Sequence, residues 1–358
     1  GNAPAIAFFS MADRAEGTRR IYRVDPNGLA LLRTYLDRMW DQVLHNLRDG
    51  LADAPGSPRI RYWELYNEPD NTDHELAKEG RAWGYWGREG AAYAQMLKRA
   101  YPAIRLANPA AKVLLGGLAY DAFPEDGGPF NPAFLDDVLR AGGGCCFDIM
   151  NLHYYPLFAF RWQPQGPDIV GKIQAVRRKL GGYGLDKPLM VTEAGMWSAA
   201  LPPYPPATPD DQVRYVAKLF ARSLATGVQT VIWFQYDDVT GFDDPARGLV
   251  DTALQPKPAE TAFRLASELL ADAVPERQSR DLLAAGEVYW FKQGPDRLAV
   301  AWTEDGSQAS LSIRAREVQW VHGLGSRQSL RDESDGKLDG QVTVRYGRDP
   351  IFIQVPGE

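Results

Sequence analysis

The sequence predicts an α/β fold of the TIM (β/α)8-barrel type, followed by a small antiparallel β domain. From about residue 5 to 272, short apolar runs alternate with segments of helical periodicity, which is typical of a parallel sheet with helical crossovers. The apolar runs are nearly continuous, as in strands buried on both faces. Polar residues collect just past the runs, where barrels of this type carry their active sites.

The first region divides into six expected strands and six expected helices. Runs of branched, aromatic and other apolar residues predict strands at 6–9, 60–66, 113–115, 147–152, 189–192 and 231–234. Helical spacing, with glycine or proline at many of the ends, predicts helices at 29–47, 90–104, 131–140, 169–180, 210–226 and 258–270. No glycine-rich dinucleotide fingerprint follows any of the strands, which argues against a doubly wound nucleotide-binding sheet.

After about residue 274 the pattern changes to strands without intervening helices. Turn residues separate the expected strands 287–291, 298–302, 309–313, 341–344 and 350–355. We therefore predict a barrel domain over 1–273 and an antiparallel β-sandwich domain over 274–358.

Composition excludes several classes of function. The net charge of −6 and the lack of a basic cluster argue against nucleic acid or an anionic membrane as a partner. No apolar run reaches the roughly 18 residues of a membrane span. The four histidines are scattered and match no metal-ligand spacing, so neither a metal nor an organic cofactor is expected. The compartment stays open, with a secreted or periplasmic location favoured over a cytoplasmic one.

The two cysteines, Cys145 and Cys146, are adjacent in the sequence. Neighbouring cysteines meet disulfide geometry only with strain. We therefore expect buried thiols, the alternative being a vicinal disulfide or redox switch.

The strongest chemical motif is YWELYNEPD at 62–70. Glu68 ends a strand, because Pro69 cannot continue the ladder. Desolvation by the surrounding aromatic residues would raise the pKa of the Glu68 carboxyl and suit it to general acid catalysis. Asn67 offers a donor and an acceptor for a sugar hydroxyl. Glu64 points inward by strand alternation and is interpreted as a structural charge that needs a cationic partner.

A second glutamate, Glu193, ends another buried strand in LMVTEAGMW at 189–197. It follows Glu68 by 125 residues, or three β-α units of about 40 residues each. Strands three apart in an eight-stranded ring face each other across its mouth. A carboxylate pair roughly 5–5.5 Å apart would hydrolyse a glycoside with retention of configuration. The alternative is a pair of capping or solvated carboxylates.

These two motifs resemble those of the clan A glycoside hydrolases, in which the acid/base ends the fourth strand and the nucleophile the seventh. Three neighbouring stretches, Trp86-Gly87, YAQMLK at 93–98 and KVLLGGL at 112–118, are similar to family 39 and its relatives, which carry a β-sandwich beside the barrel. The resemblance covers roughly residues 60–240 well. It implies that Glu68 is the acid/base and Glu193 the nucleophile.

The resemblance also implies substrate-binding residues. Asn67 would bind the hydroxyl next to the anomeric carbon, and His153 or Tyr154 would hydrogen-bond the nucleophile. Trp233 would form the floor of the subsite that holds the cleaved sugar. The alternatives are a structural histidine and a tryptophan that fills the barrel.

Two further tryptophans lie in loops beside glycine or other small residues, Trp86 and Trp197. Flat apolar rings suit the apolar faces of sugars, and Trp86 would border the cleft. Both residues are equally interpretable as loop anchors.

One feature departs from the clan. Only one strand and one helix precede Ile60, so the first two β-α units, roughly 80 residues, are expected to be missing. The chain would then be an internal fragment, a truly incomplete barrel, or a barrel completed by a partner chain or a second copy. Unpaired strand edges favour such homo-oligomers.

The sequence therefore predicts a retaining glycosidase that acts on β-linked oligo- or polysaccharides without a cofactor. The rival hypothesis is a catalytically degenerate barrel that binds carbohydrate or serves as a scaffold. The presence of both glutamates favours the enzyme, and the missing strands favour the rival.

Overall fold

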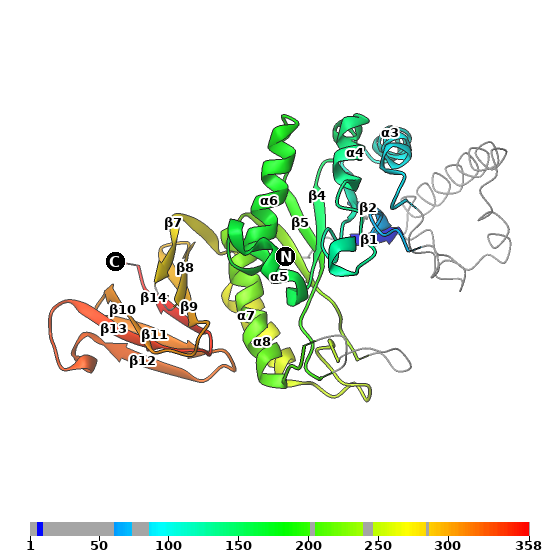
Figure 1. Cartoon of the computed structure of the whole chain (residues 1–358). Helices are drawn as coiled ribbons and strands as arrows, with labels where there is room; N and C mark the ends of the chain where they lie inside the picture. The colour runs from blue at the N-terminus through cyan, green and yellow to red at the C-terminus, as the bar shows by residue number, and fades with distance from the viewer. Residues whose placement is uncertain are drawn as a thin grey trace, which may run out of the picture. The chain divides into compact units, whose positions relative to one another are not determined.

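The computed structural model describes residues 6–9, 61–73, 86–200, 205–238, 246–283 and 286–357 (Figure 1). The chain divides into two compact units, which are described separately. The first comprises Gly1–His153 with Arg177–Thr192, and the second Tyr154–Val176 with Glu193–Glu358.

The first unit contains a parallel sheet. Its strands are β1 (Ile6–Phe9), β2 (Tyr62–Asn67) and β3 (Lys112–Gly117), followed by β4 (Met150–Tyr154) and β5 (Leu189–Ala194), whose last residues enter the second unit. Parallel pairing joins β1 to β2 and β2 to β3. Parallel bridges from Leu114 to Ile149 and from Leu118 to Leu152 continue the sheet to β4, which neighbours β5. β2 to β5 are almost wholly buried, as their continuous apolar runs predict.

Helices connect these strands. They are α3 (Gly90–Ala107), α4 (Phe134–Arg140), the single turn α5 (Ala159–Trp162) and α6 (Asp168–Gly182), which starts in the second unit. Leu114 on β3, Ile149 directly before β4 and Met190 on β5 pack together in the core of the first unit.

In the second unit, the end of β5 neighbours β6 (Val228–Trp233), and the Phe234 N–H donates to the Ala194 carbonyl at 2.7 Å. Two helices, α7 (Pro209–Ala225) and α8 (Pro258–Leu269), lie side by side (Figure 1). α7 begins with a capping box, in which the Thr208 hydroxyl accepts from the Asp211 N–H and the Asp211 carboxylate accepts from the Thr208 N–H.

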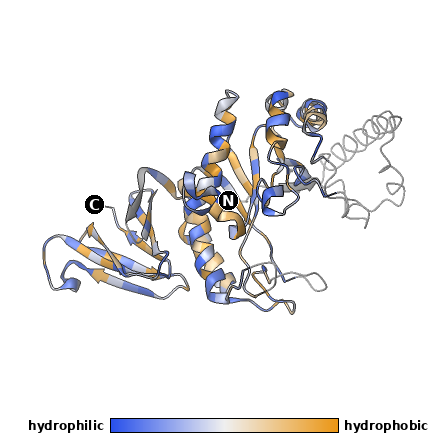
Figure 2. Ribbon diagram, in the orientation of Figure 1, coloured by the Kyte–Doolittle hydropathy of each residue, from blue (hydrophilic) through white to orange (hydrophobic). Residues whose placement is uncertain are grey.

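The C-terminal part of the second unit is antiparallel. Its strands are β7 (Val274–Leu283), β8 (Gly286–Gln293), β9 (Asp296–Thr303), β10 (Ala309–Arg314), β11 (Glu317–His322), β12 (Arg327–Arg331), β13 (Gln341–Tyr346) and β14 (Ile351–Val355). A six-stranded sheet has the order β12-β11-β14-β9-β8-β7, and β10 pairs with β13 in a second sheet. The strands of this part carry both hydrophobic and hydrophilic residues (Figure 2). The two kinds alternate along β10 and β13, whereas β8, β9 and β14 carry continuous apolar runs. Buried residues from both sheets form a single core.

Most expected elements are confirmed within the described residues. All six expected strands of the first region are present, as are five of the six helices, to within three residues at almost every end. The five expected C-terminal strands are also present, whereas β7, β11 and β12 were not predicted. The domain boundary at 273/274 stays a prediction.

Two expectations concern residues outside the described ranges. The helix expected at 29–47 lies there, and so does the segment on which the expectation of two missing β-α units depends. Among the described residues, no helix is both long and apolar enough to cross a membrane.

The expectation of two free thiols is wrong, because Cys145 and Cys146 form a vicinal disulfide. The pair ends a single helical turn, Gly143–Cys145, that follows Gly142 in the left-handed conformation. Cys146 is buried while Cys145 is exposed. The adjacency argument did not anticipate a turn that directs both sulfur atoms toward each other.

Candidate active site

Glu68 follows the last residue of β2 in a strained backbone conformation. Its φ angle of 44° lies in the left-handed region, as does that of Tyr66 at 84°. The Glu68 N–H donates to the Gly117 carbonyl at 3.0 Å, which ties this turn to the end of β3. Non-glycine residues held in this region store strain, and such strain clusters at functional sites.

His153, near the end of β4, lies between two carboxyl groups. Its Nδ1 is 3.2 Å from Glu68 Oε1, and its Nε2 is 3.8 Å from Glu64 Oε1. The imidazole is buried, while the Glu68 side chain is 15% exposed and so stays accessible to a ligand. Glu64 points inward as predicted, and its Oε1 accepts from the Gly117 N–H at 2.9 Å.

Gly117 leaves room for this arrangement. A Cβ at this position would lie 2.1 Å from His153 Nε2 and 2.9 Å from Glu64 Oε1. The second glycine of the KVLLGGL stretch is therefore required by the histidine that packs on it. No side chain fits without displacing the Glu68 partner.

Asp70 is a second, fully buried carboxyl group beside Glu68. Its oxygens accept from the Ala119 N–H at 3.2 Å and the Tyr120 N–H at 2.8 Å. Desolvation raises the pKa of Asp70 to about 7, the Tyr120 N–H opposes this rise, and the charge of Glu68 adds to it. The two carboxyl groups of this turn are therefore electrostatically coupled.

Glu193, the other predicted catalytic residue, lies next to the last residue of β5 and is half-buried. The Tyr155 hydroxyl donates to Glu193 Oε1 at 2.5 Å. A hydrogen bond from a phenol fixes the orientation of the carboxylate that accepts it. Tyr155 therefore holds Glu193 Oε1 in place at the end of β5.

Arg247 packs on Tyr155, the residue that hydrogen-bonds Glu193, and Trp233 holds the backbone of Arg247. The Arg247 guanidinium carbon lies 5.1 Å from the centre of the Tyr155 ring and 5.4 Å from that of Phe234. Trp233 is buried, and its Nε1–H donates to the Arg247 carbonyl at 3.1 Å. The tryptophan at the end of β6 thereby fixes the backbone of the arginine that covers Tyr155.

The small residue after β5 has a packing function. A Cβ on Gly195 would lie 2.3 Å from the Phe234 carbonyl oxygen. At Gly195 the space is taken by the backbone that follows β6.

The predicted binding residues differ in their surroundings. Asn67 is half-buried at the end of β2, opposite Gly117. Trp86 and Trp197 are each 2% exposed. Trp86 packs edge-on against Tyr66 and Tyr93, and the Trp197 Nε1–H donates to the Pro205 carbonyl. This burial favours the loop-anchor alternative for both tryptophans.

The expectation that His153 or Tyr154 hydrogen-bonds the nucleophile stays a prediction. Tyr154 is buried, and its hydroxyl donates to Asp168 Oδ1 at 2.6 Å. Successive side chains of a strand point to opposite faces, so His153 and Tyr155 share a face from which Tyr154 is turned away. Tyr155 hydrogen-bonds Glu193, and sequence reasoning did not name it.

Sequence reasoning also missed Asp70 and Arg247. Asp70 lies within the motif already quoted for Glu68, and its place two residues after a strand-ending glutamate was the available signal. Arg247 had no such signal, because it follows the last barrel strand by 14 residues and reaches Tyr155 only through the fold.

Comparison with families of known proteins gives one match of substantial length. The model of the glycosyl hydrolase catalytic core matches residues 34–253, more than half of the chain. Among curated proteins, the HTH-type transcriptional regulator Rv2034 of Mycobacterium tuberculosis is 59% identical over 34 residues. That match covers 10% of this chain and 32% of that protein, and it shows no family.

Solved structures share the fold at low identity. A family 39 glycoside hydrolase from Bacteroides cellulosilyticus WH2 has a TM-score of 0.60 at 19% identity over 95% of this chain. This chain spans 62% of that protein's length. A GH30 endoxylanase from Clostridium papyrosolvens C71 has a TM-score of 0.58 at 12% identity, covering 89% of this chain and 71% of its own.

A third structure is AbfB, a family 51 α-L-arabinofuranosidase from Bifidobacterium longum. Its TM-score is 0.53 at 14% identity, covering 84% of this chain and 68% of its own. The neighbours are TIM-barrel glycoside hydrolases of families 39, 30 and 51, which confirms the barrel-type fold and the resemblance to clan A. With the match over 34–253, the chain belongs to the glycosyl hydrolase catalytic core family.

Proposed function

We propose that this protein is a retaining glycoside hydrolase, with Glu193 as nucleophile and Glu68 as acid/base. The observation that carries the proposal is the placement of two glutamates at the carboxyl ends of β2 and β5, each with its own hydrogen-bonding partner. In barrels of this type, strands deliver catalytic residues from those ends. Membership of the catalytic core family supports the glycosidase activity.

In the first step, a Glu193 oxygen attacks the anomeric carbon while the bond from that carbon to the leaving oxygen breaks. Glu68 donates its proton to the leaving oxygen, so the aglycone departs as an alcohol. The hydrogen bond from Tyr155 orients the Glu193 carboxylate for the attack. The product is a covalent glycosyl-enzyme ester on Glu193 and an ionised Glu68.

In the second step, Glu68 removes a proton from water, and the water oxygen attacks the anomeric carbon. The ester bond to Glu193 breaks, which restores both carboxyl groups and inverts the carbon a second time. His153 fits this exchange of roles, because its Nδ1 lies 3.2 Å from Glu68 Oε1. An imidazole nitrogen can donate a hydrogen bond to an ionised carboxylate and accept one from a protonated carboxyl group. The mechanism requires carboxyl groups roughly 5–5.5 Å apart.

The proposed substrates are β-linked glycosides, in oligo- or polysaccharide chains. Asn67 would bind the hydroxyl next to the anomeric carbon, and Trp233 would form the floor of the sugar subsite. The fold neighbours include an endoxylanase and an arabinofuranosidase, so pentose-containing chains enter the proposal as substrates to test first.

The test is a panel of aryl glycosides that includes β-xylosides, β-glucosides and α-L-arabinofuranosides. Wild type is compared with Glu68→Ala and Glu193→Ala, each checked for folding by circular dichroism. We expect turnover by wild type, and a loss of at least about 10⁴-fold in kcat for Glu193→Ala. Full activity of Glu193→Ala would exclude it as the nucleophile. No turnover on any member, with oligosaccharide binding retained, would favour the rival carbohydrate-binding function.

A further inference from the structure

The residue beside Tyr155 is anchored on the opposite face of the chain. Tyr154 is buried, and its hydroxyl donates to Asp168 Oδ1 at 2.6 Å. Its ring also lies 5.5 Å from the ammonium nitrogen of the fully buried Lys172. Because the two tyrosines are adjacent and point to opposite faces, whatever fixes Tyr154 also sets the direction of Tyr155.

Asp168 connects Tyr154 to helix α7. It begins α6 with a φ angle of 51°, in the left-handed region, and its second oxygen accepts from Arg222 Nη1 at 2.7 Å. A non-glycine residue keeps such a conformation only where its surroundings determine it. One oxygen of the Asp168 carboxylate therefore accepts from Tyr154 on β4, and the other accepts from Arg222 on α7.

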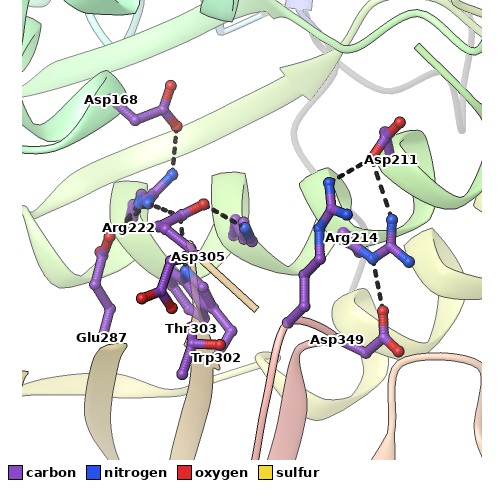
Figure 3. Close-up of polar contacts among 12 residues, drawn as sticks. Asp168, Asp211, Arg214, Arg222, Glu287, Trp302, Thr303, Asp305 and Asp349 are labelled. Carbon is purple, nitrogen blue, oxygen red and sulfur yellow. Dashed lines mark hydrogen bonds and ion pairs between the residues drawn. The ribbon is translucent and has the colours of Figure 1, made fainter. Parts of the chain in front are cut away.

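Arg222 connects α7 to the C-terminal sheet. Its guanidinium is 4% exposed and donates twice to Glu287 on β8, at 3.1 and 2.6 Å. It also donates to Glu304, which follows β9, at 2.6 Å. Figure 3 shows Arg222 directed at Asp168 on one side and at Glu287 on the other. A planar fork of donors holds such a geometry more firmly than an ammonium group would.

The charges of this cluster are strongly coupled. Burial opposes the charge on Arg222, but Asp168 and Glu287 outweigh it and raise the guanidinium pKa. Burial likewise opposes ionisation of Glu304, yet Lys218 and Arg222 lower its pKa to about 2. Buried ion pairs of this kind add little net stability over apolar packing, and they are retained in some proteins because they specify geometry.

We infer that Tyr154, Asp168, Arg222 and Glu287, which we call the Arg222 chain, form a positioning device that aims Tyr155 at Glu193 from the C-terminal sheet. This inference rests on the proposed function for its catalytic consequence. The structural part of the inference is that β8 is linked to the end of β5 through Tyr155. This part depends only on contacts within the second unit. The C-terminal sheet is on this view part of the catalytic apparatus rather than an appended module.

The helix that carries Arg222 also offers a matched control. Arg214 lies two turns earlier on α7 and contacts Asp349, in the turn before β14, at 2.6 Å and Asp211 at 3.1 Å (Figure 3). It ties the same helix to the same C-terminal part of the chain. Its described ion pairs do not include Asp168 or Glu287, so Arg214→Gln tests helix docking without touching the Arg222 chain.

The first experiment measures amide hydrogen exchange in peptides that cover 154–168 and 189–198. Tyr154→Phe removes one hydroxyl and keeps the ring, so it avoids the folding risk of Arg222→Gln. We expect exchange at least about tenfold faster in both peptides for Tyr154→Phe, and no change there for Arg214→Gln. Unchanged exchange at 189–198 in Tyr154→Phe would overturn the linkage, whether or not the protein hydrolyses any glycoside.

The second experiment measures kcat and KM on the best aryl glycoside for Tyr154→Phe, Tyr155→Phe and the double variant. If Tyr154 acts through Tyr155, kcat for Tyr154→Phe falls about tenfold at unchanged KM, and the double variant is no slower than Tyr155→Phe. Additive losses would show a general structural effect and overturn the inference. If wild type hydrolyses the glycoside and Tyr154→Phe has the same kcat and KM, this inference is refuted. If wild type hydrolyses no glycoside, the proposed function is refuted.

Discussion

The carboxyl ends of β2 and β5 each carry a glutamate, but the two ends are built differently. Glu68 stands on a strained backbone, beside an imidazole and close to the fully buried carboxyl group of Asp70. Glu193 lies within a regular strand and accepts a short hydrogen bond from Tyr155, whose ring Arg247 covers.

This difference indicates different chemistry for the same residue type. A carboxyl group next to another carboxyl group and a histidine is suited to gaining and losing a proton. A carboxylate that a phenol holds in one orientation is suited to attacking a carbon atom. The two environments, more than the glutamates themselves, thus support the proposal of the acid/base at β2 and the nucleophile at β5.

The largest expected effect is a difference between Glu68→Ala and Glu193→Ala in how kcat/KM depends on the leaving group. Glu68→Ala should lose about 10²- to 10⁴-fold in kcat/KM on glycosides with poor leaving groups, and much less on those with good ones. Glu193→Ala should be inactive on both, because no leaving group replaces the nucleophile. The measurement is kcat/KM across aryl glycosides of graded phenol pKa. The comparison would fail if the loss in Glu68→Ala did not depend on the leaving group, or if Glu193→Ala were active on the glycosides with good leaving groups.

The next effect concerns the pH dependence of stability at the β2 end. Because folding raises the pKa of Asp70 from 3.8 to about 7, the protonated form is favoured in the folded state. The protonated carboxyl group of Asp70 therefore contributes fully to the free energy of unfolding below pH 3.8, and this contribution is lost as the pH rises through about 7. The contribution is at most about 4 kcal/mol. Asp70→Asn stays neutral throughout, so wild type should lose its stability advantage over the variant as pH rises.

Urea unfolding at pH 4.5, 6 and 8 checks this expectation. The amide cannot accept both backbone N–H groups, which costs Asp70→Asn about 1–3 kcal/mol at every pH. Asp126→Asn, an exposed aspartate of the same unit, is the control and should show no such trend. If the free energy of unfolding of wild type minus that of Asp70→Asn is constant or grows with pH, the raised pKa of Asp70 is contradicted.

A smaller effect is expected from Gly117→Ala. The added methyl group would meet His153 Nε2 and Glu64 Oε1, so it should displace the imidazole and destabilise the fold by about 1–3 kcal/mol. Gly181→Ala on α6 meets no atom within 4 Å and should be neutral or slightly stabilising. Thermal unfolding compares the two. A stable Gly117→Ala variant with unchanged activity would show that the histidine position is not critical.

The smallest effect is expected at the β5 end, from Tyr155→Phe. Loss of the donated hydrogen bond leaves the Glu193 carboxylate less firmly oriented toward the anomeric carbon, so kcat should fall at least about tenfold at unchanged KM. Steady-state kinetics on one aryl glycoside measures this loss. An unchanged kcat would show that Tyr155 does not orient Glu193 for catalysis.

The sequence predicted the strand-end positions of both glutamates because strand length, proline and apolar periodicity are local properties. It did not distinguish Tyr154 from Tyr155, because the face to which a strand residue points depends on how the strand enters the sheet. Arg222 gave no signal at all, since its partners lie 54, 65 and 82 residues away. The missed strands β7 and β12 are edge strands, whose polar sequences lack the apolar run used to find the others.

The most direct test of the two assignments is the configuration of the product when azide replaces the missing carboxylate. In Glu193→Ala, azide should enter the vacated space and attack the substrate itself, giving the inverted α-glycosyl azide from a β-glycoside. In Glu68→Ala, the glycosyl-enzyme still forms from an activated aryl glycoside, and azide should release the retained β-glycosyl azide. Proton NMR of the two products decides the question. An inverted product from Glu68→Ala, or a retained one from Glu193→Ala, would contradict the roles assigned to β2 and β5.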